Sequence, residues 1–287
     1  MSAVTAILSI QSSVAYGHVG NSAVTFPLMR MGVEVYPVLT VHFSNHTGYG
    51  AWRGPHISAG DLTEVIRGLD ERGVLSGCDA VLSGYQGGAD VGEVILEAVA
   101  LVKERNPRAV YCCDPVLGDI GRGLFVRPGV PELIRDQVIP AADISTPNQY
   151  ELDYLTGRRT KTLDDVVAAA DALRGRGPQI VLVTSVLQRE VDPHSITMVV
   201  VSDDAAWSIT TPELPQSFNG AGDLTAAIFL AQWLNAADIR AALARTAAIV
   251  FGLLAATVAA GERELQLVAA QNEIVSPSHS FEVTRLR

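Results

Sequence analysis

The chain has 287 residues, 48% of them apolar, and a formal net charge of −10. This length supports one large α/β domain or two small ones with a substantial core, and the negative charge disfavours nonspecific binding to nucleic acid. The cysteines, Cys78, Cys112 and Cys113, are odd in number and two are adjacent, which argues against a disulfide framework and fits a reducing, cytoplasmic compartment.

The N-terminal segment predicts a strand, a loop, a helix and a second strand. It lacks the basic region of a signal peptide, so we expect none. The run Val4–Ile10 favours a central strand, residues 11–20 a polar loop, Asn21–Met31 a helix and Val33–Val41 the next strand. This unit implies a parallel sheet, whose ligands lie beyond the carboxyl ends of its strands.

The segment His42–Trp52 combines two histidines and a threonine with Phe, Tyr and Trp among glycines. Aromatic rings with a few polar groups suit a flat heteroaromatic ligand; the alternative is a surface loop whose aromatic residues only pack. The spacing of His42 and His46 would suit a metal on a helix. The glycines disfavour that helix and therefore the metal.

The middle of the chain alternates helices with short strands. We expect a helix from Ser58 to about Arg72, a strand at Ala80–Leu82, a helix at Val91–Lys103 and a strand at Ala109–Cys113. Tyr85, in the loop after the first of these strands, either packs or contacts a ligand.

Two acids follow strand ends in this region. Asp114 comes directly after Cys113 and precedes a proline, and Glu151 lies in the first turn of a helix that Pro147 opens, after a strand at Asp143–Thr146. Both acids have a structural alternative, as a turn residue and as a helix cap. The functional reading is that they hold a hydrated Mg²⁺ on ATP, because Mg²⁺ takes only one or two carboxylates and keeps several waters.

The C-terminal half predicts further helices and an antiparallel hairpin. We expect helices at Val130–Val138, Leu163–Arg174, Ile239–Ala260 and Glu262–Ile274, a strand at Ile180–Val183 that runs into Thr184 and Ser185, and an edge hairpin of Ser195–Val201 with Ala205–Thr210. The apolar run Ala247–Ala260 is too short to span a bilayer, so we expect a buried helix and no membrane partner. No linker divides the chain, which predicts a single domain over residues 1–287.

A glycine turn, Asn219–Gly222, opens a helix predicted over Leu224–Leu234, with Asp223 at the junction. Free backbone N–H groups and the helix dipole make such a turn an anion site. Asp223 is either a stabilising cap or the base that takes a proton from an alcohol attacking a phosphoryl group. The chain contains no Walker A sequence, so a nucleotide enzyme here would not be of the P-loop type.

The segment Gly220-Ala-Gly-Asp223 resembles the Gly-Thr-Gly-Asp motif of the ribokinase-like superfamily, with Ala221 in place of threonine. Other segments extend the resemblance over the whole chain: Gln11-Ser12, Tyr16-Gly-His-Val-Gly-Asn-Ser22, Phe43-Ser-Asn-His-Thr47, Leu82-Ser-Gly-Tyr85, Cys113-Asp-Pro-Val-Leu-Gly118 and Thr146-Pro-Asn-Gln-Tyr-Glu151. Together they resemble the pyridoxal kinases, the vitamin B6 kinase branch of that superfamily. The resemblance implies a three-layer α/β/α fold with a mostly parallel central sheet.

The resemblance also implies roles for individual residues. Asp223 matches the catalytic base that acts on the 5′-hydroxyl of pyridoxal. The other matches are the following: Gly220, Ala221 and Gly222 for the γ-phosphate; Ser12 and Thr47 for the polar groups of the ring; His46, Gly48 and Tyr85 for lining or covering the ring; Thr146, Thr184 and Ser185 for nucleotide phosphates; Phe218 and Asn219 near the adenine; Asp114 and Glu151, with Asn148 of the Asn-x-x-Glu pattern, for the phosphate and Mg²⁺ site. Some bacterial members carry lysine at the position of Thr184.

The implied cofactors are ATP and Mg²⁺, the implied partner is pyridoxal in vitamin B6 salvage, and family members are homodimers. The resemblance leaves open a monovalent cation such as K⁺ and the preference among pyridoxal, pyridoxine and pyridoxamine. Two other functions stay open on the sequence. One is a kinase of the same fold for hydroxymethylpyrimidine or another B6 vitamer. The other is a weakly active pyridoxal phosphate-binding protein, which is favoured only by the absence of a hydroxyl group at Ala221.

Overall fold

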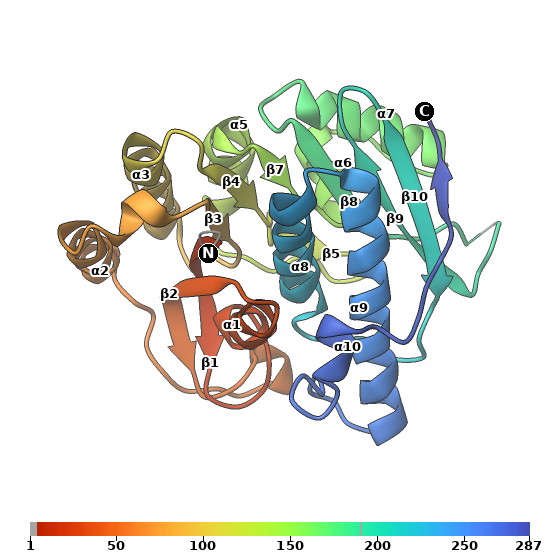
Figure 1. Ribbon diagram of the computed structural model, residues 1–287, viewed down its shortest axis with the longest axis horizontal. Helices are drawn as coiled ribbons and strands as arrows, with labels where there is room; N and C mark the ends of the chain where they lie inside the picture. Colours follow the sequence, from red (N-terminus) through yellow and green to blue (C-terminus); the bar gives the residue numbers. More distant parts are fainter. Residues whose placement is uncertain (1–4, 190) are drawn as a thin grey trace.

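A nine-stranded sheet forms the middle layer of the computed structural model, which describes residues 5–189 and 191–287 (Figure 1). Its strand order is β11-β10-β9-β8-β7-β4-β3-β1-β2, parallel from β2 to β8 and antiparallel from β8 to β11. The strands are β1 (Ala6–Val14), β2 (Glu34–Phe43), β3 (Ala80–Ser83), β4 (Val110–Cys113), β7 (Ile144–Ser145), β8 (Ile180–Val186), β9 (Ser195–Val201), β10 (Ala206–Pro212) and β11 (Val283–Arg285). Strands β5 (Gly118–Asp119) and β6 (Gly123–Leu124) pair separately as a small hairpin.

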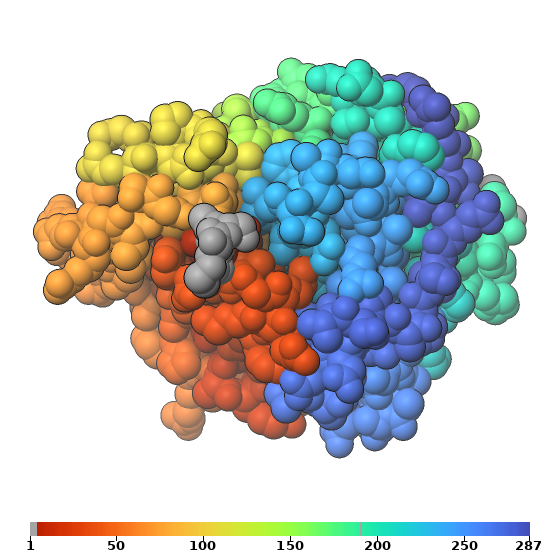
Figure 2. Space-filling model, viewed as in Figure 1, coloured from red at the N-terminus to blue at the C-terminus, as the bar shows by residue number. Residues whose placement is uncertain are grey.

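Helices cover both faces of this sheet and give the expected three layers. One face carries α1 (Asn21–Arg30), α8 (Ala221–Ala236) and α9 (Ile239–Ala260), with the short α10 (Asn272–Val275) against α9. The other carries α2 (Ala59–Glu71), α3 (Ala89–Arg105), α4 (Val130–Leu133), α5 (Ile139–Ala141), α6 (Gln149–Thr156) and α7 (Leu163–Arg174), with a π turn at Ile134–Val138 between α4 and α5. Figure 2 shows α1 in red meeting the blue C-terminal helices on the first face.

Alternation along the strands explains the two cores. On β1, Ile7 packs with α1 and α8, whereas Leu8 and Ile10 pack with α2 and α3, because successive side chains of a strand point to opposite faces. A strand buried on both sides reads as a continuous apolar run. The one sheet takes strands from both ends of the described chain, which supports our proposal of a single domain.

The structure corrects four details of the sequence prediction. Strand β1 continues to Val14, so Gln11 and Ser12 lie on the strand and not in a loop. Pro147 precedes helix α6, whose N-cap is Asn148. Strand β11 pairs with β10, so the predicted hairpin is not at the edge of the sheet. The predicted helix at Glu262–Ile274 is wrong: α9 ends at Gly261, with φ +68°, and the following residues form turns up to α10.

Helix α9 is long and apolar enough, by length and composition, to cross a membrane. At 22 residues it is longer than the run from which we judged its span, so length alone does not exclude a membrane helix. Within the structure, however, 56% of its most apolar part is buried, against α8 and the antiparallel strands. We therefore read α9 as a core helix.

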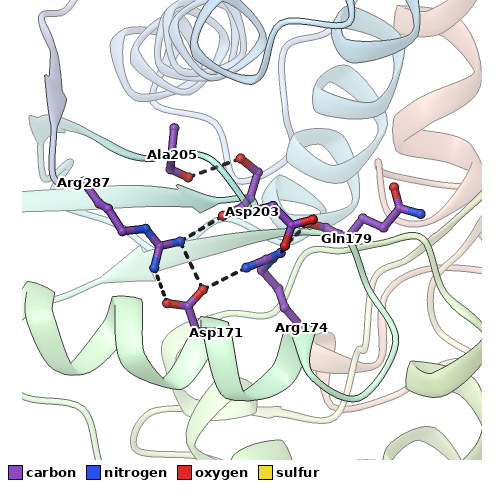
Figure 3. Close-up of polar contacts among 7 residues, drawn as sticks. Asp171, Arg174, Gln179, Asp203, Ala205 and Arg287 are labelled. Carbon is purple, nitrogen blue, oxygen red and sulfur yellow. Dashed lines mark hydrogen bonds and ion pairs between the residues drawn. The ribbon is translucent and has the colours of Figure 1, made fainter.

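A cluster of charged side chains holds the C-terminal strand in place (Figure 3). Asp171 on α7 accepts from Arg174 at 2.9 Å and from Arg287 at 2.5 Å. Arg174 also pairs with Asp203 in the turn between β9 and β10, and Arg287 donates to the carbonyl of Ser202 at 2.9 Å. The cluster thus joins three separate elements around the end of β11.

Candidate active site

A cleft of about 1050 Å³ opens where the parallel strands end and α8 begins. The following residues singled out from the sequence line it: Ser12, His46, Thr47, Tyr85, Asp114, Thr146, Asn148, Glu151, Thr184, Ser185, Phe218, Asn219, Gly220, Ala221, Gly222 and Asp223. Gly48 is the exception, because it lies outside the lining, next to Thr47. The topology therefore brings together residues more than 200 positions apart.

The glycine turn has the backbone geometry of an anion site. Gly220 is the N-cap of α8 in the left-handed conformation, with φ +81°, and no side chain caps the helix. The first N–H groups of α8 therefore have no intrahelical partner, and they border the cleft. A Cβ atom on Gly220 would lie 1.9 Å from the carbonyl oxygen of His18, so only glycine allows this turn to pack on the loop after β1.

Asp223 lies in the first turn of α8 and is partly exposed to the cleft. Burial raises the pKa of its carboxyl group, and the N–H groups of Gly20 and of Asp223 itself oppose that shift. A carboxylate with a raised pKa is a stronger base than an ordinary aspartate. Its position beside the free N–H groups suits proton removal from a nucleophile that attacks an anion bound there.

Asp114, Glu151 and Asp223 make this part of the cleft acidic. Burial, together with the negative charges of Glu151 and Asp223, raises the pKa of Asp114 well above its usual value, while a hydrogen bond from Thr146 at 2.9 Å opposes the shift. Burial raises the pKa of Glu151 to about 8, against the stabilising N–H groups of Leu117, Asn148 and Gly118. Clustered buried carboxylates favour a bound cation.

Glu151 and Asn148 form the capping box of α6, which was the structural alternative from the sequence. The Asn148 side chain accepts from the Glu151 N–H at 2.9 Å and donates to the Gly118 carbonyl at 2.8 Å. Glu151 accepts from Asn148 through one oxygen and from Leu117 and Gly118 through the other. The described residues hold no cluster of three or more His, Cys, Asp or Glu placed for a metal. The neighbouring acids Asp114 and Glu151 match the one or two carboxylates that a cation such as Mg²⁺ takes, its other ligands being water and phosphate oxygens.

The raised pKa of Glu151 predicts a pH dependence of stability. The folded chain holds its proton up to about pH 8, whereas the ordinary value is 4.5. Stability from this group is therefore complete below the ordinary pKa and is lost as pH rises through the folded one. We expect the Tm of the metal-free protein to fall between about pH 5 and pH 8, and to fall less in Glu151→Gln. Parallel Tm curves in thermal scans of the two proteins would contradict this expectation.

The opposite end of the cleft has apolar walls. Val14, Val19, Val41 and Phe43 form a buried cluster with Tyr85 packed on it, and all five line the cleft. Tyr85 therefore both packs and faces the cavity. Sequence reasoning missed the three valines, which look like ordinary strand and loop residues until the fold brings them together. The pocket suits a flat ring.

His42 and His46, the two histidines around the end of β2, differ in their position relative to the cleft. His46 caps a short 3₁₀ turn, Thr47–Tyr49, by accepting the Gly48 N–H at 3.1 Å, and burial together with the positive charge of Arg122 lowers its pKa. His42 is exposed on β2 and outside the cleft lining. The helix that a metal pair would need is absent from this described segment.

The remaining end of the cleft is built by β8, β9 and α9. Ser185, at the end of β8, has φ +57°, a strained value for a residue other than glycine. Sequence reasoning missed other residues that line the cleft: Arg122, Phe125, Leu187, Met198, Val250, Phe251 and Leu254. The only available signal was the predicted position of α9 beside the glycine helix, which does not say which side chains reach the cavity.

Comparison with known proteins agrees with this geometry. The family model described as phosphomethylpyrimidine kinase matches residues 76–267. The chain is 55% identical to a pyridoxal kinase PdxY of Rubrobacter xylanophilus over 98% of this chain and 97% of that protein, and 54% identical to one of Leifsonia xyli over 98% and 99%. Among solved structures, pyridoxal kinase from Leishmania donovani in complex with ADP and pyridoxine is 30% identical, with a TM-score of 0.92 over 98% of this chain and 99% of that one.

Proposed function

The chain belongs to the pyridoxal kinase family, and we propose that it transfers the γ-phosphoryl group of ATP to the 5′-hydroxymethyl group of pyridoxal, giving pyridoxal 5′-phosphate for B6 salvage. The observation that carries the proposal is Asp223, a carboxylate of raised pKa beside free N–H groups in a cleft with one apolar end. The ADP and pyridoxine bound by the Leishmania relative support both substrates.

The acceptor occupies the apolar end in this mechanism. The pyridine ring lies against the valines, Phe43 and Tyr85, and Ser12, His46 and Thr47 offer polar groups to its substituents, with Gly48 behind them. The 5′-hydroxyl then faces Asp223, which takes its proton as the oxygen attacks the γ-phosphorus. The bond from that phosphorus to the bridging oxygen breaks, and ADP leaves with the electron pair.

The glycine turn stabilises the charge that moves during transfer. The N–H groups of Gly220, Ala221 and Gly222 would donate to the γ-phosphoryl oxygens, and fixed donors of this kind act most strongly on charge that develops in the transition state. Ala221 has no hydroxyl to add to them. This arrangement needs no P-loop.

The donor end holds ATP. We assign Thr146, Thr184 and Ser185 to the phosphates, and Phe218 and Asn219 to the region of the adenine. Asp114 and Glu151 would hold Mg²⁺, directly or through water, and Asn148 would orient Glu151 through the capping box. When bound, the ion neutralises phosphate charge and aligns the phosphoryl group.

A coupled assay for ADP release tests the function. Pyridoxal, pyridoxine, pyridoxamine and hydroxymethylpyrimidine are compared at saturating Mg²⁺ and ATP. We expect pyridoxal to give the highest kcat/KM. Hydroxymethylpyrimidine is included because the matching family model describes a phosphomethylpyrimidine kinase. A higher kcat/KM for that substrate would change the substrate assignment, and ADP release no faster with pyridoxal than with buffer would contradict the kinase function.

Replacing Glu151 by glutamine tests the metal site. We expect the Mg²⁺ concentration for half-maximal rate to rise by about tenfold, because neutralising a residue that ligates or orients a metal commonly costs ten- to a hundredfold in affinity. The matched control is Asp165→Asn, which alters the capping box that Asp165 forms with Thr162, the N-cap of α7, away from the cleft. An unchanged Mg²⁺ titration in Glu151→Gln would leave Glu151 as a helix cap only.

The assembly and location are further proposals. We propose a homodimer, as the resemblance implies, and a cytoplasmic enzyme, for which the three buried free cysteines are the support. Burial raises the pKa of Cys78 to about 11, so its thiol is protonated and unreactive at neutral pH. We propose neither a nucleic-acid nor a membrane partner.

A further inference from the structure

Glu264 is a buried carboxylate in the turn after α9, and its partners come from the other end of the chain. It is 7% exposed. One oxygen accepts the N–H of His18 at 2.9 Å and the other accepts the hydroxyl of Tyr49 at 2.8 Å. That hydrogen bond raises the pKa of Tyr49 to about 12, so the hydroxyl stays a donor at neutral pH. Within the described residues no ion pair includes Glu264.

Arg263 contacts the same loop after β2 by two further routes. Its Nη2 donates to the carbonyl of Gly48 at 2.8 Å. Its guanidinium carbon lies 3.7 Å from the centroid of the Tyr49 ring, within the range of a cation–π interaction. Arg263 therefore fixes the backbone directly after Thr47, which lines the cleft.

The loop after β1 is enclosed between Glu264 and the glycine turn. A Cβ atom on Gly17, which has φ +93°, would lie 2.2 Å from a carboxylate oxygen of Glu264. On the other side, the carbonyl oxygen of His18 occupies the space that a Cβ on Gly220 would need. Movement of Glu264 would thus be passed through His18 to the turn that precedes Asp223.

We infer that Arg263 and Glu264 form a clamp that holds the loops after β1 and β2 against the glycine turn, and that Glu264 is a positioning residue for the acceptor end of the cleft. Neither side chain lines the cleft, so the clamp acts through the loops. The inference rests on the proposed function for its choice of substrate. The remaining ATP contacts lie on β8, β9 and α9, so the clamp should affect the binding of pyridoxal more than the binding of ATP, which it reaches only through the glycine turn.

Glu264→Gln tests the clamp. Its one carbonyl oxygen can accept from His18 or from Tyr49 but not from both, and its NH₂ group would face the remaining donor. We expect KM for pyridoxal to rise about tenfold and kcat to fall, the size expected for a lost hydrogen bond to a charged group, with KM for ATP unchanged within about twofold. Tyr49→Phe removes one bond at a partly exposed site and should raise KM for pyridoxal with little effect on folding. Adding it to Glu264→Gln should raise KM by less than the product of the two single effects, because the two side chains are in direct contact.

Gln271→Ala is the matched control. Gln271 lies in the same C-terminal segment and accepts a hydrogen bond from Arg30 on α1 at 3.2 Å, away from the cleft. Its substitution should leave both KM values unchanged. Hydrogen exchange gives a readout that needs no turnover: Glu264→Gln should exchange faster in residues 16–19 and 46–50, and Gln271→Ala should not.

These outcomes separate the two proposals. If wild type does not phosphorylate pyridoxal, the proposed function fails, and faster exchange in both loops would still support the clamp. If wild type is active, the clamp is overturned by a folded Glu264→Gln with unchanged KM for pyridoxal, or by equal increases in KM for pyridoxal and ATP. Unchanged exchange in Glu264→Gln would overturn it in either case.

Discussion

Replacing Asp223 by alanine is expected to lower kcat by at least about 100-fold, because a positioned general base contributes roughly 100- to 10,000-fold. Pyridoxal binding should stay within a few fold, since the ring is held at the apolar end. The variant should be at least as stable as wild type near neutral pH. Burial raises the pKa of Asp223, so its charged form costs folding free energy there, and that cost disappears with the carboxylate. Steady-state kinetics, pyridoxal titration and thermal scans measure the three effects.

Asp238→Ala is a control with the reverse pattern, in which stability falls and kcat does not. Asp238 is an exposed N-cap of α9 and accepts the N–H groups of Arg240 and Ala241 at 2.9 and 3.1 Å. Asp238→Ala should cost about 1 kcal/mol of stability as a lost cap and leave kcat unchanged. Near-normal turnover of Asp223→Ala would remove Asp223 from the mechanism.

Gly220→Ala is expected to damage both folding and activity. Alanine at φ +81° costs about 1–2 kcal/mol for the left-handed conformation alone. Its Cβ would also meet the His18 carbonyl at 1.9 Å, and this contact is with backbone that cannot rotate away. We expect a lower Tm and a loss of kcat of about 100-fold, because a shift near 1 Å in a positioning group can cost that much.

Gly222→Ala, two residues further on, tests whether the glycine is needed to leave room for the ligand, because the protein itself would tolerate a side chain there. No protein atom lies within 4 Å of the Cβ position, and the residue is helical, so alanine should stabilise the helix by about 0.5–1 kcal/mol. If the γ-phosphoryl group lies against this turn, kcat/KM for ATP should fall while Tm holds or rises.

For the preceding variant, full activity in Gly220→Ala would contradict the assigned role of the turn.

Local sequence signals predicted much of the fold. Helices α7 and α9 occur at their predicted bounds, Leu163–Arg174 and Ile239–Ala260, because each has an N-cap before an apolar pattern and a glycine after it. The three-layer fold and the parallel sheet are confirmed. The pyridoxal kinase family is confirmed by the relatives of 45–55% identity.

Contacts between distant segments limited the rest. The segment Glu262–Ile274 has apolar residues that pack in a core cluster, including Leu265 and Ile274, so it resembles a helix in sequence. The left-handed Gly261 ends α9, and Glu264 turns back to His18 and Tyr49, more than 200 residues away. A local pattern does not contain such pairings.

The candidate site, like the fold, was predictable only in part. Motif residues at strand and helix ends line one cleft as expected, whereas its apolar walls come from valines and α9 residues with no motif of their own. Gly48 was predicted to line the ring, but it lies outside the cleft lining, where its N–H donates to His46 and its carbonyl accepts from Arg263. The roles assigned to the individual site residues stay predictions until they are measured.

The central claim is that Asp223 faces the acceptor hydroxyl while the N–H groups of the glycine turn hold the phosphoryl group. A crystal structure with pyridoxal and a non-hydrolysable ATP analogue measures it most directly. We predict that the 5′-oxygen of pyridoxal lies within hydrogen-bond reach, about 2.6–3.2 Å, of the Asp223 carboxylate. A bound pyridoxal whose 5′-oxygen is directed away from Asp223, with the terminal phosphate remote from Gly220 to Gly222, would contradict the account.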